Sequence, residues 1–274
     1  MPYLFIVGGG PWAKKIELVL TQSSLAFYIQ RSEARRFIEG TSPQNLNGSI
    51  IWLATQPKLQ LSLLEALSKY KAEILIDKPV VFDLSSLRTI KELEARSNSN
   101  FRIVQTWRCS QLWDISSSPL SDIRSIQIER TYVDSRDYIS PTLDWLPHDF
   151  SLLSDLGLKP SDFLLDYCDP GMGKSFSLKA HIPGGIQVEI SIFKGEARKS
   201  QWMLTHRSGL VRTIDFETRH STLCDSSGSV IETWYQPKTE HPIENVINGI
   251  GKWGVWDFQN QLEYYEWYFR LGGV

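Results

Sequence analysis

The first hundred residues contain short apolar runs separated by stretches with helical spacing. A short apolar run predicts a strand, and leucines at positions 59, 63, 64 and 67 predict an amphipathic helix. Because strands that alternate with helices form βαβ units, we expect a parallel sheet with helices on both faces. The expected strands are Tyr3–Val7, Leu25–Ile29, Ser49–Ala54, Glu73–Ile76 and Phe101–Gln105, and the expected helices are Pro11–Leu20, Arg31–Ile38, Leu59–Tyr70 and Leu84–Arg96.

The pattern changes after about residue 120, where extended segments follow one another closely. Turns such as Pro183-Gly184-Gly185 and Ser208-Gly209 join them, and connections this short indicate antiparallel pairing, because a parallel crossover needs about a dozen residues or more. Two helical stretches, Pro242–Lys252 and Phe258–Leu271, follow. The expected strands are Arg124–Val133, Ser175–Ile182, Gln187–Phe193, Gln201–His206, Leu210–Glu217 and Ser229–Trp234.

The polar segment Ser116–Ser118 separates these two patterns and is the expected hinge between domains. A chain of 274 residues is long for one compact core, so two domains are expected. We therefore predict an α/β protein with a doubly wound parallel sheet in residues 1–118. Residues 119–274 are expected to form an α+β domain with an open, mostly antiparallel sheet.

Composition narrows the classes of function. A net charge of -2 gives no general basic field, so neither nucleic acid nor membrane is an expected partner. Cys109, Cys168 and Cys224 stand far apart, which predicts no zinc ribbon or disulfide framework and favours a reducing, cytoplasmic location. The five histidines lack HxxxH or HExxH spacing, so no metal site is expected. No signal peptide is expected, and no apolar run reaches the ~18 residues of a membrane helix.

Glycines after the first expected strand carry a nucleotide-binding pattern. In Gly8-x-Gly10-x-x-Ala13 the first glycine makes a tight turn, the second lets the backbone approach a pyrophosphate, and the small third residue lets the helix pack on the strand. Pro11 suits the first helical position, and the helix N-terminus that includes Trp12 offers N–H groups to phosphate. A plain glycine turn is the alternative, but the βαβ context favours a Rossmann-type dinucleotide site.

The end of the second strand bears on the choice of cofactor. An Asp or Glu here would bind the ribose 2′-OH of NAD, but the strand runs into Gln30-Arg31-Ser32. Arg31 and Ser32 would instead accept a 2′-phosphate, so NADP is favoured and NAD is less expected. In the alternative, Arg31 caps a surface helix and Glu33 takes the acidic role.

Three further motifs follow in order. The loop Ala54-Thr55-Gln56-Pro57 comes after the third strand, and the triplet Asp77-Lys78-Pro79 comes after the fourth. Asp144-Trp145-Leu146-Pro147-His148 lies at the head of a helical stretch in the second half. Together they resemble the Thr-Pro-like loop, the Glu-Lys-Pro triplet and the Asp-x-x-x-His pattern of the Gfo/Idh/MocA family of oxidoreductases. The resemblance spans most of the chain.

This resemblance implies roles for three residues. Lys78 would lie next to the nicotinamide and hold or protonate a substrate oxygen, because an ammonium stabilises a developing alkoxide. His148 would be the partner acid or base, and Asp144 would orient His148 or bind a substrate hydroxyl. The alternatives are an exposed lysine at a sheet edge for Lys78, and an N-cap for Asp144 with Pro147 in the first helical turn.

The resemblance also implies the wider site and includes departures from the family pattern. Gln60 stands where the family often has His or Glu, Asp77 replaces Glu, and the stretch before the His motif is short. Arg108 would contact substrate or cofactor, or would form an ion pair between domains. The nucleotide would contact Gly8, Gly10, Pro11, Trp12, Ala13, Arg31, Ser32, Thr55, Gln56, Pro57, Asp77 and Lys78, and the substrate would contact Lys78, Trp107, Arg108, Asp144, Trp145 and His148.

From this resemblance we expect an NADP-dependent oxidoreductase that transfers hydride to or from a hydroxyl or carbonyl carbon of a sugar or sugar-nucleotide-like substrate. A reductase of an imine or another conjugated double bond, in a secondary-metabolite or tetrapyrrole pathway, is the alternative. A non-catalytic nucleotide-binding member is the third reading. A homodimer or dimer of dimers through the C-terminal sheet is also expected, because its strands carry apolar residues on both faces, including Phe193, Trp202 and Met203.

Overall fold

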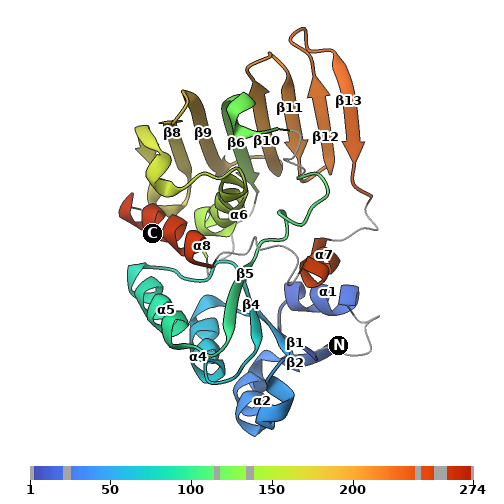
Figure 1. The fold of residues 1–274 in the computed structure, drawn as a ribbon, viewed down its shortest axis with the longest axis vertical. Coiled ribbons are helices and arrows are strands. Elements are labelled where there is room, and N and C mark those ends of the chain that lie inside the picture. Colours follow the sequence, from blue (N-terminus) through green and yellow to red (C-terminus); the bar gives the residue numbers. More distant parts are fainter. Residues whose placement is uncertain are drawn as a thin grey trace. The chain divides into compact units, whose positions relative to one another are not determined.

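The computed structural model describes residues 3–20, 26–113, 118–133, 139–237, 242–249 and 258–272 (Figure 1). The chain divides into two compact units, Met1–Gln105 with Ile243–Tyr265, and Thr106–Pro242 with Glu266–Val274. This division differs from the expected one at residue 118, because the first unit ends at Gln105 and regains a C-terminal segment. Residues 25, 116, 117 and 250–252, which belong to expected elements, lie outside the described ranges.

The first unit contains a parallel sheet in the order β2-β1-β3-β4-β5. The chain passes from β1 to β2 on one side, and later to β3 on the other side of β1. This reversal of strand order makes the carboxyl ends of β1 and β3 the point at which doubly wound sheets bind ligands. The strands are β1 (Leu4–Gly8), β2 (Ala26–Gln30), β3 (Ile50–Ala54), β4 (Glu73–Asp77) and β5 (Asn100–Val104).

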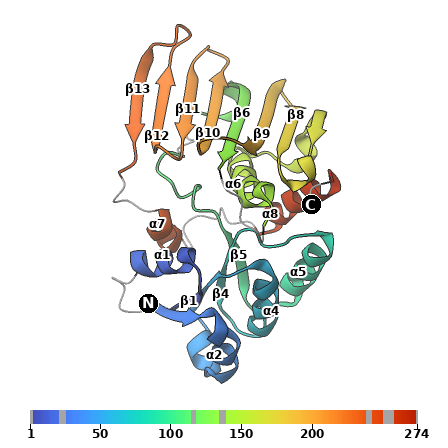
Figure 2. The same cartoon turned by 180° about the vertical axis from the view of Figure 1, so that it is seen from behind.

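Helices cover both faces of this sheet. Helix α1 contacts β1 and β2, whereas α4 contacts both α2 and α5, as right-handed crossovers in opposite directions require. Both views show α1 beside α7 and α4 beside α5 (Figure 2). In the described ranges no helix has the length and apolar character needed to cross a membrane. The helices are α1 (Pro11–Leu20), α2 (Ala34–Gly40), α3 (Pro43–Leu46), α4 (Pro57–Leu67), α5 (Leu84–Arg96), α7 (Pro242–Gly249) and the first part of α8 (Phe258–Arg270), with a 3-10 turn at Arg31–Glu33.

The second unit contains a sheet in the order β13-β12-β11-β10-β6-β9-β8-β7, antiparallel at every pair except β6 with β9. The predicted fold class, a parallel sheet plus a mostly antiparallel one, is thus confirmed. The elements are β6 (Ile123–Tyr132), α6 (Pro141–Asp155), β7 (Leu164–Asp169), β8 (Phe176–Ile182), β9 (Ile186–Lys194), β10 (Lys199–His206), β11 (Val211–Asp215), β12 (His220–Cys224) and β13 (Val230–Tyr235), with 3-10 turns at Leu120–Asp122, Pro160–Asp162 and Gly171–Gly173.

The two faces of the second sheet differ. Helix α6 packs on β6 and β9, and side chains on that face are buried, including Trp202, which is fully buried. The opposite face carries Phe193 and Met203 but otherwise mainly polar side chains, such as Gln127 and Glu189. Apolar side chains therefore occur on both faces, because strand alternation turns Trp202 towards α6 and turns Phe193 and Met203 away from it.

Candidate functional site

The glycine turn after β1 has the packing that a nucleotide fingerprint requires. A Cβ on Gly8 would collide with the Cβ of Ala13 and lie 2.8 Å from the carbonyl oxygen of Ala54. A Cβ on Gly10, in contrast, would meet nothing within 4 Å. Gly8 and Ala13 therefore allow α1 to pack closely on the sheet, while Gly10 faces open space that a phosphate group can approach.

The N-terminus of α1 faces the same turn. Pro11 is the first helical residue, and the N–H of Lys14 donates a hydrogen bond to the carbonyl of Gly10, at 3.2 Å. The N–H groups of Trp12 and Ala13 precede this bond and are oriented out of the helix end. No acidic residue occupies the first turn. The positive end of the helix dipole is thus suited to an anion.

Arg31 lies next to the glycine turn. Gly8 pairs with Gln30 across β1 and β2, and a Cβ on Gly9 would come within 3.3 Å of the Cβ of Arg31. Arg31 and Ser32 are both exposed in the 3-10 turn that follows β2. Glu33 is exposed in that turn as well. The geometry therefore places the Cβ of Arg31 beside the glycine turn, at the carboxyl ends of the parallel strands.

Gln60 joins the carboxyl ends of β3 and β4. Its side-chain Nε2 donates to the carbonyl oxygens of Thr55 at 2.8 Å, Asp77 at 3.0 Å and Leu53 at 3.4 Å. The hydroxyl of Thr55 and the Oε1 of Gln60 are buried and have no hydrogen-bond partner among the described residues. Unpaired buried polar atoms are rare, and of these two only the Thr55 hydroxyl belongs to a half-buried residue that a bound nucleotide could approach.

The backbone around Lys78 is held on both sides. Gln60 binds the carbonyl of Asp77, and the N–H of Val80 donates to the hydroxyl of Tyr265 at 3.4 Å. Burial raises the pKa of Tyr265, so its phenol stays protonated. The carboxylate of Asp77 is buried and accepts a hydrogen bond from the Trp52 indole at 3.0 Å. Asp77 is thus held by the sheet, and half-buried Lys78 follows it.

These contacts bring together most of the predicted cofactor residues. The glycine turn, Arg31, the Thr55 loop and Lys78 follow the carboxyl ends of β1, β2, β3 and β4, respectively. Because these strands are adjacent and parallel, the segments lie along one edge of the sheet. Pro57 is the first residue of α4, and exposed Gln56 precedes it.

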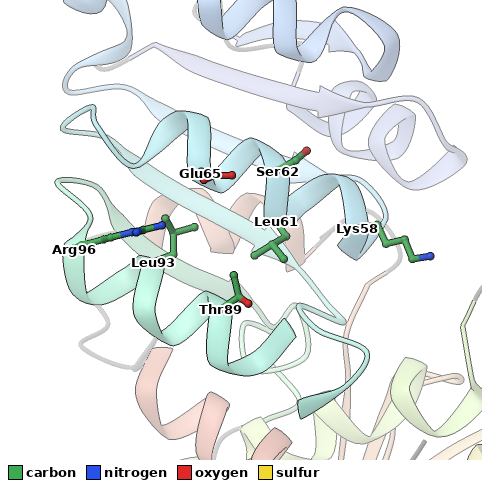
Figure 3. A pocket seen from close by; sticks show the side chains of 7 residues that line it. All are labelled: Lys58, Leu61, Ser62, Glu65, Thr89, Leu93 and Arg96. Carbon is green, nitrogen blue, oxygen red and sulfur yellow. The ribbon is translucent and has the colours of Figure 1, made fainter. Parts of the chain in front are cut away.

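A separate cavity of about 240 Å³ lies between α4 and α5 (Figure 3). Leu61 and Leu93 form its apolar part, and Lys58, Glu65 and Arg96 are among its polar residues. None of the predicted cofactor residues contributes to it, so this cavity is not the nucleotide crevice.

The Asp-x-x-x-His motif of the second unit lies inside α6. Ser140 is the N-cap, because its hydroxyl accepts a hydrogen bond from the N–H of Leu143 at 3.2 Å. The N-cap alternative for Asp144 is therefore wrong, and Pro147 lies within the helix rather than in its first turn. Asp144 and His148 are four residues apart and share one face of α6.

His148 belongs to an aromatic cluster. Its ring stacks on Trp107, with centroids 4.3 Å apart and planes 21° apart. Trp107 also stacks on Phe216, at 4.7 Å and 6°, and lies 5.6 Å from Trp145. His148 is only 7% exposed. The cluster fixes the plane of the imidazole, and it brings predicted substrate residues Trp107, Trp145 and His148 together within the second unit.

A buried ion pair supports this cluster from the sheet side. Arg130 and Asp149 are both fully buried, and the guanidinium binds the carboxylate through Nε and a terminal nitrogen. Ser200 also accepts a hydrogen bond from Arg130, and the Trp202 indole donates to Asp149 at 2.8 Å. The guanidinium carbon lies 4.1 Å from the ring centroid of Trp107. The sequence patterns did not predict this network. Arg130, a charged residue on an otherwise apolar face of its strand, was the signal that could have indicated it.

Arg108 forms an ion pair within the second unit. Its Nε donates to Asp155 at 2.9 Å, a terminal nitrogen binds the other carboxylate oxygen, and the Trp113 indole adds a hydrogen bond at 3.0 Å. Burial raises the pKa of Asp155, whereas Arg108 opposes this rise. Burial also raises the pKa of the neighbouring Cys109 thiol to about 12. Arg108 therefore forms an ion pair with Asp155, and both residues belong to the second unit. Contact of Arg108 with substrate stays a prediction.

Comparisons with known proteins show what this architecture resembles. No family model and no curated protein matches the chain. A UDP-N-acetylglucosamine 3-dehydrogenase from Acidithiobacillus ferrooxidans is 13% identical over 100% of this chain and 98% of its own, with a TM-score of 0.75. A Gfo/Idh/MocA family oxidoreductase from Vibrio cholerae is 11% identical, covering 100% and 96%, with a TM-score of 0.69.

A third solved structure is a biliverdin reductase from Synechocystis sp. PCC 6803 in complex with biliverdin and NADP+. It is 11% identical over 99% of this chain and 96% of its own, with a TM-score of 0.67. At such identities the likeness is one of fold, and it extends over both units. The chain thus has the fold of the Gfo/Idh/MocA-type oxidoreductases.

Proposed function

We propose that this protein is an NADP-dependent oxidoreductase that transfers hydride to or from a hydroxyl or carbonyl carbon of a sugar or sugar-nucleotide-like substrate. One observation carries the proposal. The glycine turn, the Thr55 loop and Lys78 lie along one edge of the parallel sheet, at the reversal of strand order where such sheets bind nucleotides. The oxidoreductases that share the fold support the reaction class.

The residues at this edge fit a dinucleotide. The N–H groups of Trp12 and Ala13 would bind its diphosphate beside the open space at Gly10, and Arg31 with Ser32 would bind a 2′-phosphate. The Thr55 hydroxyl, which has no hydrogen-bond partner among the described residues, would donate a hydrogen bond to the dinucleotide or accept one from it. A bound nicotinamide supplies or accepts the hydride. The NADP+ complex of one protein with this fold supports a nicotinamide cofactor, and Arg31 supports NADP over NAD.

The proton chemistry is assigned to three side chains. Lys78 would hold the substrate oxygen and protonate it, or stabilise it as an alkoxide, because an ammonium is both a donor and a positive charge. His148 would act as the partner acid or base, with its ring plane fixed by Trp107. Asp144, one helical turn before His148, would orient the imidazole or bind a substrate hydroxyl.

The second candidate is a reductase of an imine or another conjugated double bond. The observation that favours it is the aromatic cluster around His148, because the rings of Trp107, Trp145 and Phe216 provide an environment suited to a planar substrate. A biliverdin reductase is among the proteins with this fold. A nucleotide-binding protein without turnover is the third candidate.

A substrate screen distinguishes these candidates. Purified protein with NADPH would be offered nucleotide-linked ketosugars, free ketoses, cyclic imines and a linear tetrapyrrole, and loss of nicotinamide absorbance would be recorded. The Lys78→Ala variant is the control for unspecific NADPH oxidation. Turnover of a ketosugar supports the first proposal, and turnover of only the imine or tetrapyrrole supports the second. NADPH binding without turnover of any class favours the third, and no nucleotide binding contradicts all three.

We also propose that the protein associates as a homodimer or dimer of dimers through the second sheet. The support is the face of the second sheet opposite α6, which no helix of the described residues covers. The pairs Lys199 with Glu129 and Lys179 with Glu189 make this face more polar than expected. Polar faces of this kind associate through hydrogen bonds and complementary charges as well as apolar contacts. A monomer mass in light scattering at micromolar concentration would reject the proposal.

A further inference from the structure

A cavity of about 440 Å³ opens at one end of the second sheet, on the face that α6 covers elsewhere. It lies where β10 ends, where β11 and β13 begin and where the chain enters β6. Its volume is within the range of roughly 300 to 1,000 Å³ that small-molecule sites occupy. The residues around it have no part in the proposed active site, so the cavity needs a separate explanation.

The floor of this cavity consists of buried polar side chains. Ser118 is 2% exposed, His206 is 8% exposed and Arg212 is 6% exposed. The Ser118 hydroxyl lies 3.5 Å from Nε2 of His206. Removing a guanidinium and an imidazole from water is costly, so buried groups of this kind need hydrogen-bonding or charged partners, and a cavity that opens on them gives a ligand access to them.

The charges are arranged by depth. Among the described residues, four charged side chains surround the cavity: Asp122, Arg207, Arg212 and Glu232. Asp122, Arg207 and Glu232 are exposed at the rim, where water screens them, whereas Arg212 is in the buried floor. Arg207 also donates to the backbone carbonyls of Ser121 and Gly184. The four charges sum to zero, but the charge that water screens least is the positive charge of buried Arg212.

Trp234 orients the buried cation. The guanidinium carbon of Arg212 lies 4.8 Å from the Trp234 ring centroid. Stacking engages the face of a guanidinium, whereas its N–H groups point outward in the plane and match the two oxygens of a carboxylate or phosphate. Half-buried Leu210 and Leu223 line the cavity wall and supply apolar surface next to this donor set.

We infer that this cavity is a second small-molecule site, which binds the carboxylate or phosphate group of a ligand through Arg212, His206 and Ser118. The apolar part of the ligand contacts Trp234 and Leu223. The site is separate from the His148 cluster, because Phe216 of that cluster follows the far end of β11. Phe216 is four residues from Arg212, roughly 13 Å along a strand. The inference does not depend on the proposed oxidoreductase activity.

His206 provides a direct readout. Burial and the charge of Arg212 lower its pKa, and Asp122 partly opposes this shift. A bound anion would favour the protonated imidazole and raise that pKa, so binding would strengthen as the pH falls. The test is a pH titration of the histidine Cε1–Hε1 NMR signals, with inorganic phosphate or propionate as the probe and chloride holding the ionic strength constant. His206→Gln assigns the signal.

The expected result is a saturable rise in the His206 pKa with at least one probe, while the other histidines respond as in chloride. Saturation by phosphate alone identifies a phosphate ligand, and saturation by propionate alone identifies a carboxylate. Arg212→Gln should weaken binding by about ten- to a hundredfold. Arg198→Gln is the matched control, because it removes an exposed arginine at the other end of β10 and should leave binding unchanged.

Two outcomes would overturn the inference. One is a His206 pKa in wild-type protein that neither probe changes beyond the chloride control. The other is equal binding in wild type and Arg212→Gln. If Arg212→Gln does not fold, Arg212→Lys replaces it, since lysine keeps the charge but lacks the planar fork. Unchanged affinity in Arg212→Lys would then contradict the role of the guanidinium.

Discussion

The side chain of Gln60 donates a hydrogen bond to the carbonyl of Asp77, the residue before Lys78, at 3.0 Å. The same nitrogen binds the carbonyl of Thr55, so one amide couples the loop after β3 to the catalytic candidate after β4. Gln60 is fully buried, which excludes water as a substitute donor. In the proposed chemistry Gln60 would therefore act through the backbone of Thr55 and Asp77 rather than by touching substrate.

Gln60→Met tests this coupling. Methionine fills a similar volume but donates nothing, so buried carbonyls lose a shared donor, and we expect a loss of roughly 1 to 3 kcal/mol in unfolding free energy. Denaturant unfolding measures the loss, and NADPH titration shows whether the cofactor edge is disturbed. Gln60→His, which keeps an N–H donor, should recover part of the lost stability and part of any lost NADPH affinity. Equal stability of Gln60→Met and wild type would contradict the role of the hydrogen bonds.

Cofactor choice is predicted to depend on Arg31. Arg31→Ala should weaken NADPH binding by roughly 1 to 3 kcal/mol and leave NADH nearly unchanged, because only NADPH carries the 2′-phosphate. Nicotinamide fluorescence excited through the tryptophans measures both affinities. Arg36→Ala, in the helix after the same turn, is the matched control for a change in net charge. Equal affinities of wild type for both nucleotides, or tighter NADH, would reject the assignment.

The buried pair of Arg130 and Asp149 should dominate the stability of the second unit. Asp149→Asn leaves a fully buried guanidinium without its counter-charge, which typically costs about 3 to 5 kcal/mol. Arg130→Met combined with Asp149→Leu removes both charges and should recover much of that loss. Urea unfolding followed by tryptophan fluorescence compares the three proteins. A double variant as unstable as Asp149→Asn would show that packing, not the unpaired charge, sets the cost.

The sequence patterns predicted the helices and strands of the first unit more accurately than those of the second, for physical reasons. Expected and observed bounds agree for Pro11–Leu20 and Leu84–Arg96, where apolar residues recur with clear helical spacing. β7 was not expected, because its residues are mostly exposed and show no alternation, and β12 is only five residues long with few apolar positions. The return of the C-terminal segment to the first unit had no local signal.

Long-range pairs limited the prediction of the site. The glycine turn and the motif of α6 are short, continuous patterns, so the sequence reveals them. Arg130 and Asp149 lie 19 residues apart on a strand and a helix, and only the packed structure joins them. Phe216 stacks on Trp107 from more than a hundred positions away. Spacing rules cover neighbours on one element and do not reach contacts of this kind.

Stability should depend on pH through His206. Burial, followed by the charge of Arg212, lowers its folded-state pKa below the ordinary value of 6.5, so the unfolded chain binds the proton more tightly. Stability is then complete above about pH 6.5 and falls as the pH drops towards the folded-state pKa. His206→Gln should lose part of this acid sensitivity, as melting temperatures across that range would show. Exposed His220→Gln is the control, and identical pH profiles for wild type and His206→Gln would contradict the prediction.

The roles of the catalytic candidates are separable by kinetics and stability. His148→Ala should lower turnover roughly 10²- to 10⁴-fold, the usual worth of a positioned general acid or base, and Lys78→Ala should do the same while NADPH stays bound. Asp144→Ala should have a milder effect on turnover. Because Ser140 is the N-cap of α6, Ser140→Ala rather than Asp144→Ala should cost about 1 kcal/mol of stability. Single-turnover rates and melting temperatures of all four variants measure both effects.

Loss of activity in His148→Ala could also come from lost packing, because the His148 ring is stacked on Trp107. His148 packs on Trp107, so its removal also leaves space in the aromatic cluster and should lower the melting temperature. His148→Phe preserves a ring for stacking and removes only the titratable group. If the imidazole is an acid or base, His148→Phe should keep more stability than His148→Ala and yet remain as inactive. Recovery of turnover in a folded His148→Phe protein would instead make His148 part of the packing and move the proton transfer to another residue.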